Sequence, residues 1–230
     1  MTGATGNIYC GLHEYVDMSF VLHVLRPGDL FVDIGANIGS YSVLASKVCG
    51  ASVIAIEPDP DTAKHLYRNF QINDVLDVSE IAETALGASR GTVSFTIGLD
   101  TTNKVADGAD KDVRTAPLTT LDSLLEKRRP RVIKMDVEGY EAEVLKGAEK
   151  TLECPDLLAI ISESGQPEVV DKLKDRGFEQ FFYDPASKEL GDQQAFHKSN
   201  NSLFIRISAK EKISKILTSC ELRKFRGGPV

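Results

Sequence analysis

The feature that most restricts the fold of this chain is the alternation of short apolar runs with longer amphipathic stretches. The apolar runs begin near Leu30, Ser52, Val78, Arg131, Leu157, Phe178 and Asn201. The run at residues 53–56 is continuously apolar, which is typical of a strand buried on both faces. The pattern predicts an α/β fold in which helices cover a mostly parallel sheet.

Amphipathic stretches between the runs predict the helices, at residues 14–25, 41–48, 60–73, 140–152, 167–177 and 209–226. We expect Asp59 or Asp61 to cap the helix that starts at Pro60. We expect Gly177 to end the helix that starts at residue 167. Residues 91–125 break the alternation and predict a hairpin, a polar loop and a capped helix. We expect the part from about residue 100 to 112 to act as a mobile cover over the substrate.

Composition excludes several classes of protein. With 230 residues and 42% hydrophobic content, the chain is long enough for one domain over 1–230, with an N-terminal helical segment (1–27) and a C-terminal helix and tail (209–230). A net charge of −7 predicts no nucleic-acid partner. The cysteines lack metal-binding spacing, and no apolar stretch is long enough to span a membrane. We therefore expect a cytoplasmic protein without a membrane partner, and oligomeric state stays open.

The glycine-rich turn after the first apolar run is the strongest functional signal. It has the pattern Asp33-x-Gly35-x-Asn37-x-Gly39, whereas a dinucleotide turn reads G-x-G-x-x-G. Asn37 can adopt the left-handed conformation in place of a glycine. The Asp33 carboxylate would repel a pyrophosphate and attract an ammonium group. A ligand with an ammonium, a carboxylate and an adenosine fits this turn, which points to S-adenosylmethionine (SAM).

The end of the second run supports the same ligand. Glu57 lies 22 residues after Gly35, where an acidic side chain accepts hydrogen bonds from ribose hydroxyls. We expect its carboxylate at an open strand end, with little effect on folding. Glu83, Thr84 and Ala85 are expected to border the adenine. The predicted cofactor-binding residues are Asp33, Gly35, Ala36, Asn37, Gly39, Glu57, Pro58, Thr84 and Ala85. A purely structural role for Asp33, as a helix cap, stays open.

With the later segment DVEGYE (136–141), the turn makes the chain similar to FkbM-type methyltransferases. The matching segments are RPGDLFVDIGANIGSYSVLAS, VIAIEPDP, ALGASRGTVSF, TTNKV, TTLDSLL and VIKMDVEGYEAEVLKGA. The resemblance implies a Rossmann-like class I methyltransferase sandwich, with a seven-stranded mostly parallel sheet and a β-hairpin insertion before the fourth core strand. It also implies SAM-dependent methyl transfer, typically to oxygen, on a sugar, small molecule or secondary-metabolite scaffold.

The resemblance places Asp136 and Glu138 at the transfer site, and we assign them as catalytic residues. A charged Lys134-x-Asp136 pair inside an apolar run favours a functional role for Asp136, because helix capping does not explain it. These two carboxylates without a clear third ligand make a poor metal site, so no metal is predicted. Glu141 is expected to cap the following helix.

Several side chains fit either of two roles. Asn103 is assigned to substrate binding, although a turn role fits it equally well. Glu163 either approaches the substrate or caps a loop, and His13 and Glu14 either reach the site or lie on the surface. Two other functions stay open as alternatives: a nicotinamide-dependent oxidoreductase, which the missing G-x-G-x-x-G turn disfavours, and a non-catalytic SAM-binding scaffold.

Overall fold

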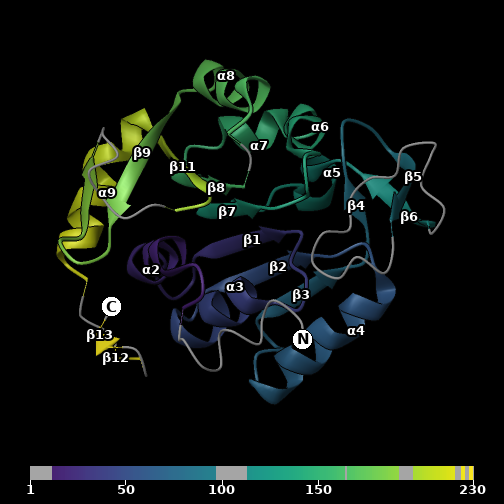
Figure 1. Cartoon of the computed structure of the whole chain (residues 1–230), viewed down its shortest axis with the longest axis horizontal. Coiled ribbons are helices and arrows are strands. Elements are labelled where there is room, and N and C mark those ends of the chain that lie inside the picture. The colour runs from purple at the N-terminus through teal and green to yellow at the C-terminus, as the bar shows by residue number, and fades with distance from the viewer. Residues whose placement is uncertain are drawn as a thin grey trace.

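A large mixed sheet forms the centre of the molecule (Figure 1). The computed structural model describes residues 12–96, 113–163, 165–191 and 199–220, and only the backbone of 224–225 and 228–229. The strands run in the order β10-β9-β11-β8-β7-β1-β2-β3. Their bounds are β1 (Leu30–Ile34), β2 (Ser52–Ile56), β3 (Ser79–Ala82), β7 (Val132–Met135), β8 (Ala159–Ser162), β9 (Phe178–Asp184), β10 (Glu189–Gly191) and β11 (Ser202–Arg206).

The central strands confirm the expected α/β class. Strands β3, β2, β1, β7 and β8 are parallel, whereas β11 pairs antiparallel with both β8 and β9. The expected count of seven strands is wrong by one, because the short strand β10 pairs antiparallel with β9 and extends the sheet edge.

Helices cover both faces of this sheet (Figure 1). One face carries α2 (Tyr15–Val24), α3 (Ser40–Val43), a π-helical turn (Leu44–Val48), α4 (Pro60–Ile72) and α9 (Lys210–Thr218), which follows a 3₁₀ turn (Ile207–Ala209). The other carries α5 (Leu121–Leu125), α6 (Glu141–Lys146), α7 (Glu149–Glu153) and α8 (Pro167–Asp175). Successive strand residues such as Phe31 and Val32 enter opposite cores, which explains the unbroken apolar runs.

A second, three-stranded sheet confirms the hairpin insertion before β7. It consists of β4 (Ala85–Leu86), β5 (Gly91–Thr96) and β6 (Val113–Thr119), in the order β4-β6-β5. The run at residues 78–86, expected as one strand, therefore divides between two sheets. The segment between β5 and β6 lies outside the described residues, and so do Asn103 and the expected cover. A short pair, β12 (Lys224–Phe225) and β13 (Gly228–Pro229), lies near the C-terminus.

The predicted helix over 140–152 is interrupted at Gly147. A Cβ atom at Gly147 would lie 2.1 Å from the Gly87 carbonyl oxygen, so the chain passes too close to the hairpin insertion for any other residue. Asp122 then accepts hydrogen bonds from the Lys150 and Thr151 amides at 2.9 and 2.8 Å, and these bonds help α7 restart. At α4 the cap is Asp59, which accepts from the Thr62 amide at 3.0 Å. Within the described ranges, no helix is long and apolar enough to cross a membrane.

Candidate functional site

The carboxyl ends of four neighbouring strands bring the predicted site residues together. Strands β8, β7, β1 and β2 are adjacent and parallel, so the segments that follow them meet at one edge of the sheet. Asp33 is the penultimate residue of β1, just before the glycine turn, and Glu57 follows β2. Asp136 follows β7, and Glu163 follows β8. In such a fold this edge is where ligands bind.

The turn after β1 has the conformation that its residue types predict. Gly35, Asn37 and Gly39 have φ angles of +73°, +49° and +89°, in the left-handed region. A Cβ at Gly35 would lie 1.8 Å from the carbonyl oxygen of Asp136. The glycine therefore allows the turn to approach the end of β7 closely.

The backbone amides of this turn are all used within the protein. Each N–H from residue 35 to residue 39 donates to an acceptor: the Ile56 carbonyl (residues 35 and 36), Glu57 Oε2 (37), Asn37 Oδ1 (38) and the Ala36 carbonyl (39). A phosphate-binding turn instead presents free N–H groups to the ligand. The turn therefore lacks the donors that a pyrophosphate needs.

Glu57 holds the turn in place. Its carboxylate accepts from the Asn37 amide and from the Asp59 amide, each at 3.0 Å, and the residue is only 8% exposed. Burial raises the pKa of Glu57 to about 7, although these amide hydrogen bonds oppose the rise. The expectation of an open strand end without a folding role is therefore wrong. Each oxygen keeps a second lone pair, so the carboxylate can still accept from a ligand hydroxyl.

Asp33 is almost fully buried, at 1% exposure. Ser42 Oγ donates to its Oδ2 at 2.6 Å, whereas Oδ1 has no hydrogen-bond partner among the described residues. Burial raises the pKa of Asp33, while the nearby Lys134 ammonium acts against the rise. A buried acceptor without a partner fits a ligand that brings a donor, such as an ammonium group.

Lys134 places a buried cation beneath the site. Its Nζ lies 2.6 Å from Asp136 Oδ2 and 5.2 Å from the centre of the Tyr41 ring, and the residue is 5% exposed. Burial lowers the pKa of Lys134, but the charges of Asp136 and Asp33 outweigh burial and raise it overall. The lysine therefore stays charged and neutralises part of the acidic set.

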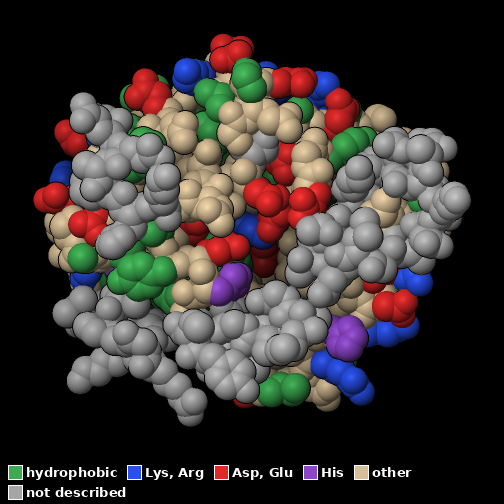
Figure 2. All heavy atoms as spheres, in the orientation of Figure 1, with side chains coloured by type: hydrophobic (Ala, Val, Ile, Leu, Met, Phe, Trp, Pro, Cys, Tyr) green, Lys and Arg blue, Asp and Glu red, His purple; other side chains and the backbone are tan. Residues whose placement is uncertain are grey.

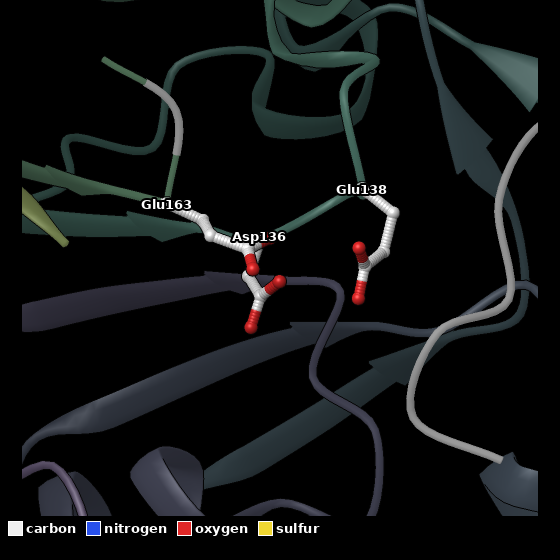
Figure 3. Close-up of side chains that lie close together, drawn as sticks. All are labelled: Asp136, Glu138 and Glu163. Atoms are coloured by element: carbon white, nitrogen blue, oxygen red, sulfur yellow. The ribbon is translucent and has the colours of Figure 1, made fainter. Parts of the chain in front are cut away.

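Asp136, Glu138 and Glu163 form an acidic cluster at the edge of the sheet (Figure 3). Carboxylate oxygens of the three residues lie within 4.8 Å of one another. Figure 2 shows acidic side chains gathered near the middle of this face, with a histidine below them in the view. The sequence assigned two of these carboxylates to the transfer site and left Glu163 open between a substrate contact and a loop cap; the structure places Glu163, which follows β8, beside the other two. The expected lack of a third carboxylate is therefore wrong and no longer argues against Mg²⁺ or Ca²⁺, but the Lys134 ammonium, which pairs with Asp136, already supplies a positive charge at this position.

The pKa values within this cluster differ. Burial alone would raise the pKa of Asp136, but Lys134 and a hydrogen bond with Glu163 lower it overall. The same hydrogen bond, then burial and the charges of Asp136, Glu138 and Glu141, raise the pKa of Glu163 to about 8. Burial and the charges of Asp136 and Glu141 also raise the pKa of Glu138. At neutral pH, Asp136 is therefore ionised while Glu163 largely holds its proton.

Glu141 supports the loop that carries Glu138. It is 1% exposed, and its Oε1 accepts from the Val137 and Gly139 amides at 3.2 and 3.3 Å. Glu138 itself has a φ of +50°. The expectation that Glu141 caps α6 is therefore wrong, because its carboxylate holds the loop before that helix instead.

A polar network that the sequence did not predict joins the start of α2 to this edge of the sheet. Glu14 Oε2 accepts from the Tyr41 hydroxyl and, at 3.0 Å, from Asn201 Nδ2. The same Asn201 amide group donates to Asp17 Oδ2 at 2.9 Å, and burial raises the pKa of Asp17 to about 6. His13 Nε2 lies 3.6 Å from Glu14 Oε1. Glu14 therefore belongs to a half-buried polar network, and no sequence motif indicated its distant partner Asn201.

The residues expected at the adenine lie where β3 leaves the large sheet. Thr84 Oγ1 donates to the Pro117 carbonyl at 2.9 Å, and Ala85 pairs with Leu118 of β6. The Glu57 amide donates to the Ala82 carbonyl at 3.1 Å. Pro58 follows directly after Glu57. The hairpin insertion and the end of β2 are thus held together beside the glycine turn.

Comparison with known proteins gives consistent matches. A family model described as the methyltransferase FkbM domain matches residues 33–180. The chain is 33% identical over 158 residues to the hexuronic acid methyltransferase AglP of Haloferax volcanii, over 66% of this chain and 64% of that protein. It is 28% identical over 207 residues to the methyltransferase sdnD of Sordaria araneosa, over 72% of this chain and 79% of that protein.

One solved structure supports the fold. The crystal structure of a methyltransferase FkbM from Methylobacillus flagellatus KT superposes with a TM-score of 0.53, at 16% identity. The match covers 82% of this chain and 50% of that chain. This chain therefore spans half of the crystallised protein and 64% of the Haloferax volcanii relative.

Proposed function

Because the chain belongs to the FkbM methyltransferase family, we propose that it transfers the methyl group of SAM to a hydroxyl oxygen of a small molecule or glycan. The observation that carries this proposal is the pairing of two features at one sheet edge. One is a glycine turn without free amides for a phosphate, and the other is an acidic cluster beside it.

The residues of the turn fit the cofactor. Asp33 Oδ1 offers an unpartnered acceptor for the ammonium group, and Glu57 keeps lone pairs for ribose hydroxyls. The turn from Gly35 to Gly39, with Ala36 and Asn37, would hold the methionine part, and Pro58, Thr84 and Ala85 would border the adenosine. Bound SAM supplies a methyl group on a positively charged sulfur, which an acidic surrounding favours.

The chain contributes positioning and proton transfer. Asp136 and Glu138 would orient the acceptor hydroxyl, and a carboxylate of this cluster would receive its proton. The hydroxyl oxygen must stand in line with the methyl carbon and the sulfur, so much of the rate comes from holding the acceptor still. Lys134 keeps Asp136 ionised and fixed in place.

A sugar is the favoured acceptor. The relative named as a hexuronic acid methyltransferase supports this class, and polyhydroxylated rings offer the donors that clustered carboxylates accept. The test uses SAM with a labelled methyl group and a panel of methyl hexopyranosides and methyl hexuronides. We expect label in a sugar methyl ether. An absence of label from every sugar, with SAM bound, would contradict the proposed acceptor class.

Two alternative functions, an oxidoreductase and a scaffold that binds SAM without catalysis, can be distinguished from methyl transfer. A nicotinamide oxidoreductase needs a turn that binds a pyrophosphate, and the amides of residues 35–39 are already occupied. A scaffold that only binds SAM would keep its affinity for the cofactor without any transfer. Transfer by the wild-type protein separates the enzyme from the scaffold. In the enzyme, Asp136→Asn should leave cofactor binding largely intact while transfer falls by roughly 10²–10⁴.

A further inference from the structure

Glu163 stands apart in sequence from the motif that contains Asp136 and Glu138, yet it lies beside them (Figure 3). The reason is the parallel pairing of β8 with β7, which aligns Ser162 with Met135. The Glu163 amide donates to the Met135 carbonyl at 3.1 Å, and this bond fixes the backbone of Glu163 next to Asp136. Its side chain is exposed, so a ligand can reach it.

Of the three carboxylates at this edge, Asp136 is the one that is paired with a cation among the described residues. Lys134 forms an ion pair with Asp136, at 2.6 Å. Within the described parts of the chain, no lysine, arginine or histidine forms an ion pair with Glu163 or Glu138. Three carboxyl groups this close cannot all be ionised without a large cost, so one proton is retained. Because Lys134 stabilises Asp136 in its ionised form, the retained proton of this hydrogen-bonded pair lies on Glu163.

We propose that Glu163 is a further catalytic residue, the carboxylate that removes the proton of the acceptor hydroxyl, with Asp136 as its fixed hydrogen-bond partner. The inference rests on the proposed methyl transfer. In the step, an electron pair of the hydroxyl oxygen forms the bond to the methyl carbon, and the bond between carbon and sulfur breaks. That bonding pair remains on sulfur, which becomes a neutral thioether, and the hydroxyl proton moves to Glu163. No further reactant is needed.

The difference in basicity between Asp136 and Glu163 indicates which of them accepts the proton. Asp136 is stabilised in its ionised form by Lys134, so it has little tendency to take a proton. Glu163 faces Asp136 just after β7, Glu138 on the loop before α6, and Glu141 at the start of α6. The hydrogen bond with Asp136 and these negative charges make Glu163 the stronger base. A base whose pKa lies near the working pH is the most effective in proton transfer.

This arrangement predicts a specific pH dependence. Glu163 must be ionised to accept the proton, so the rate constant for transfer should rise with pH through the raised pKa of Glu163. The bound sulfonium adds a positive charge and should move this rise to lower pH than in the free protein. In Glu163→Gln this carboxylate is gone and Asp136 is only weakly basic, so the rise at the pKa of Glu163 should disappear.

A titration that needs no acceptor tests the location of the proton. The full-length protein is labelled with ¹³C at the glutamate side-chain carboxyl, and its NMR signals are followed against pH, with Glu163→Gln used to assign Glu163. We expect the Glu163 signal to titrate well above the ordinary glutamate range, and to move toward that range in Asp136→Asn. Titration of Glu163 in the ordinary range near 4 to 5 would overturn the proposal.

Kinetics test the catalytic role. With a sugar that accepts label, we expect Glu163→Gln to lower kcat by roughly 10²–10⁴ and to abolish the rise with pH, while affinity for SAM is unchanged. The matched control is Glu168→Gln on α8, whose carboxylate is exposed and pairs only with Lys146 among the described residues. A Glu163→Gln enzyme with wild-type kcat would overturn the proposal. If no sugar is methylated, the proposed acceptor class fails, and the NMR titration still decides the proton's location.

Discussion

Replacing Lys134 by methionine tests the electrostatic design of the site. Methionine keeps the unbranched apolar stem but removes the ammonium, which lies 2.6 Å from Asp136 Oδ2 and interacts with the charge of the buried Asp33. Asp33 is 1% exposed and would retain only its hydrogen bond from Ser42. Removing one partner from a buried ion pair costs about 3–5 kcal/mol, so we expect a loss of this size in the free energy of unfolding near neutral pH.

The loss should depend on pH in a defined direction. Without Lys134, Asp33 and Asp136 respond by binding protons, and their pKa values in the folded state rise above those in the unfolded state. The folded variant then holds more protons than the unfolded chain above about pH 4. Its stability therefore falls as pH rises through this window, by up to about 1.4 kcal/mol per pH unit for each proton. The deficit relative to wild type should be smallest at about pH 5 and largest at about pH 8.

Urea unfolding at both pH values measures this effect. The control Lys64→Met removes an exposed ammonium that pairs with Asp61, and should leave the free energy of unfolding almost unchanged. Adding Asp33→Asn to Lys134→Met should recover part of the loss, because the buried charge is removed with its partner. A Lys134→Met deficit below about 1 kcal/mol at neutral pH, or one that is equal at the two pH values, would refute the reasoning.

Three further predictions follow from the site. Glu57→Ala should weaken SAM binding by about 1.5–3 kcal/mol and also lower stability by at least about 2 kcal/mol, because it leaves the Asn37 and Asp59 amides without their acceptor; unchanged melting would contradict the second part. Gly35→Ala should unfold the protein far more than Gly28→Ala, since both have positive φ but only Gly35 meets a backbone oxygen, and equal effects would argue against the close approach. EDTA should leave transfer intact, because Lys134 and a retained proton already balance the acidic cluster, and abolished activity would show that a metal takes part.

The central strands and the glycine turn could be predicted because their signals are local. Continuous apolar runs mark strands buried on both faces, and the left-handed positions at Gly35, Asn37 and Gly39 follow from residue types that tolerate them. The division of residues 78–86 between two sheets was missed, because it depends on pairing of β4 with β6, more than 30 residues away. No local pattern encodes that pairing.

The chemistry of the site could be predicted only in part. Asp136 and Glu138 stand in a recognisable segment, whereas Glu163 reaches them through the register of β8 with β7. Glu57 was identified by its spacing, but its hydrogen bonds to two amides emerge only when the turn packs against the end of β2. Burial and partners decide the pKa of a carboxyl group, and both depend on contacts between distant segments.

The central claim is that the turn from Asp33 to Gly39, with Glu57, binds SAM and not a dinucleotide. Isothermal titration calorimetry of the wild-type protein with S-adenosylhomocysteine, the demethylated product of SAM, and separately with NAD tests it most directly. The account predicts binding of S-adenosylhomocysteine with a Kd of about 1 μM to tens of μM, near −8 to −6 kcal/mol, and NAD binding at least about tenfold weaker. Tighter binding of NAD than of S-adenosylhomocysteine would contradict it.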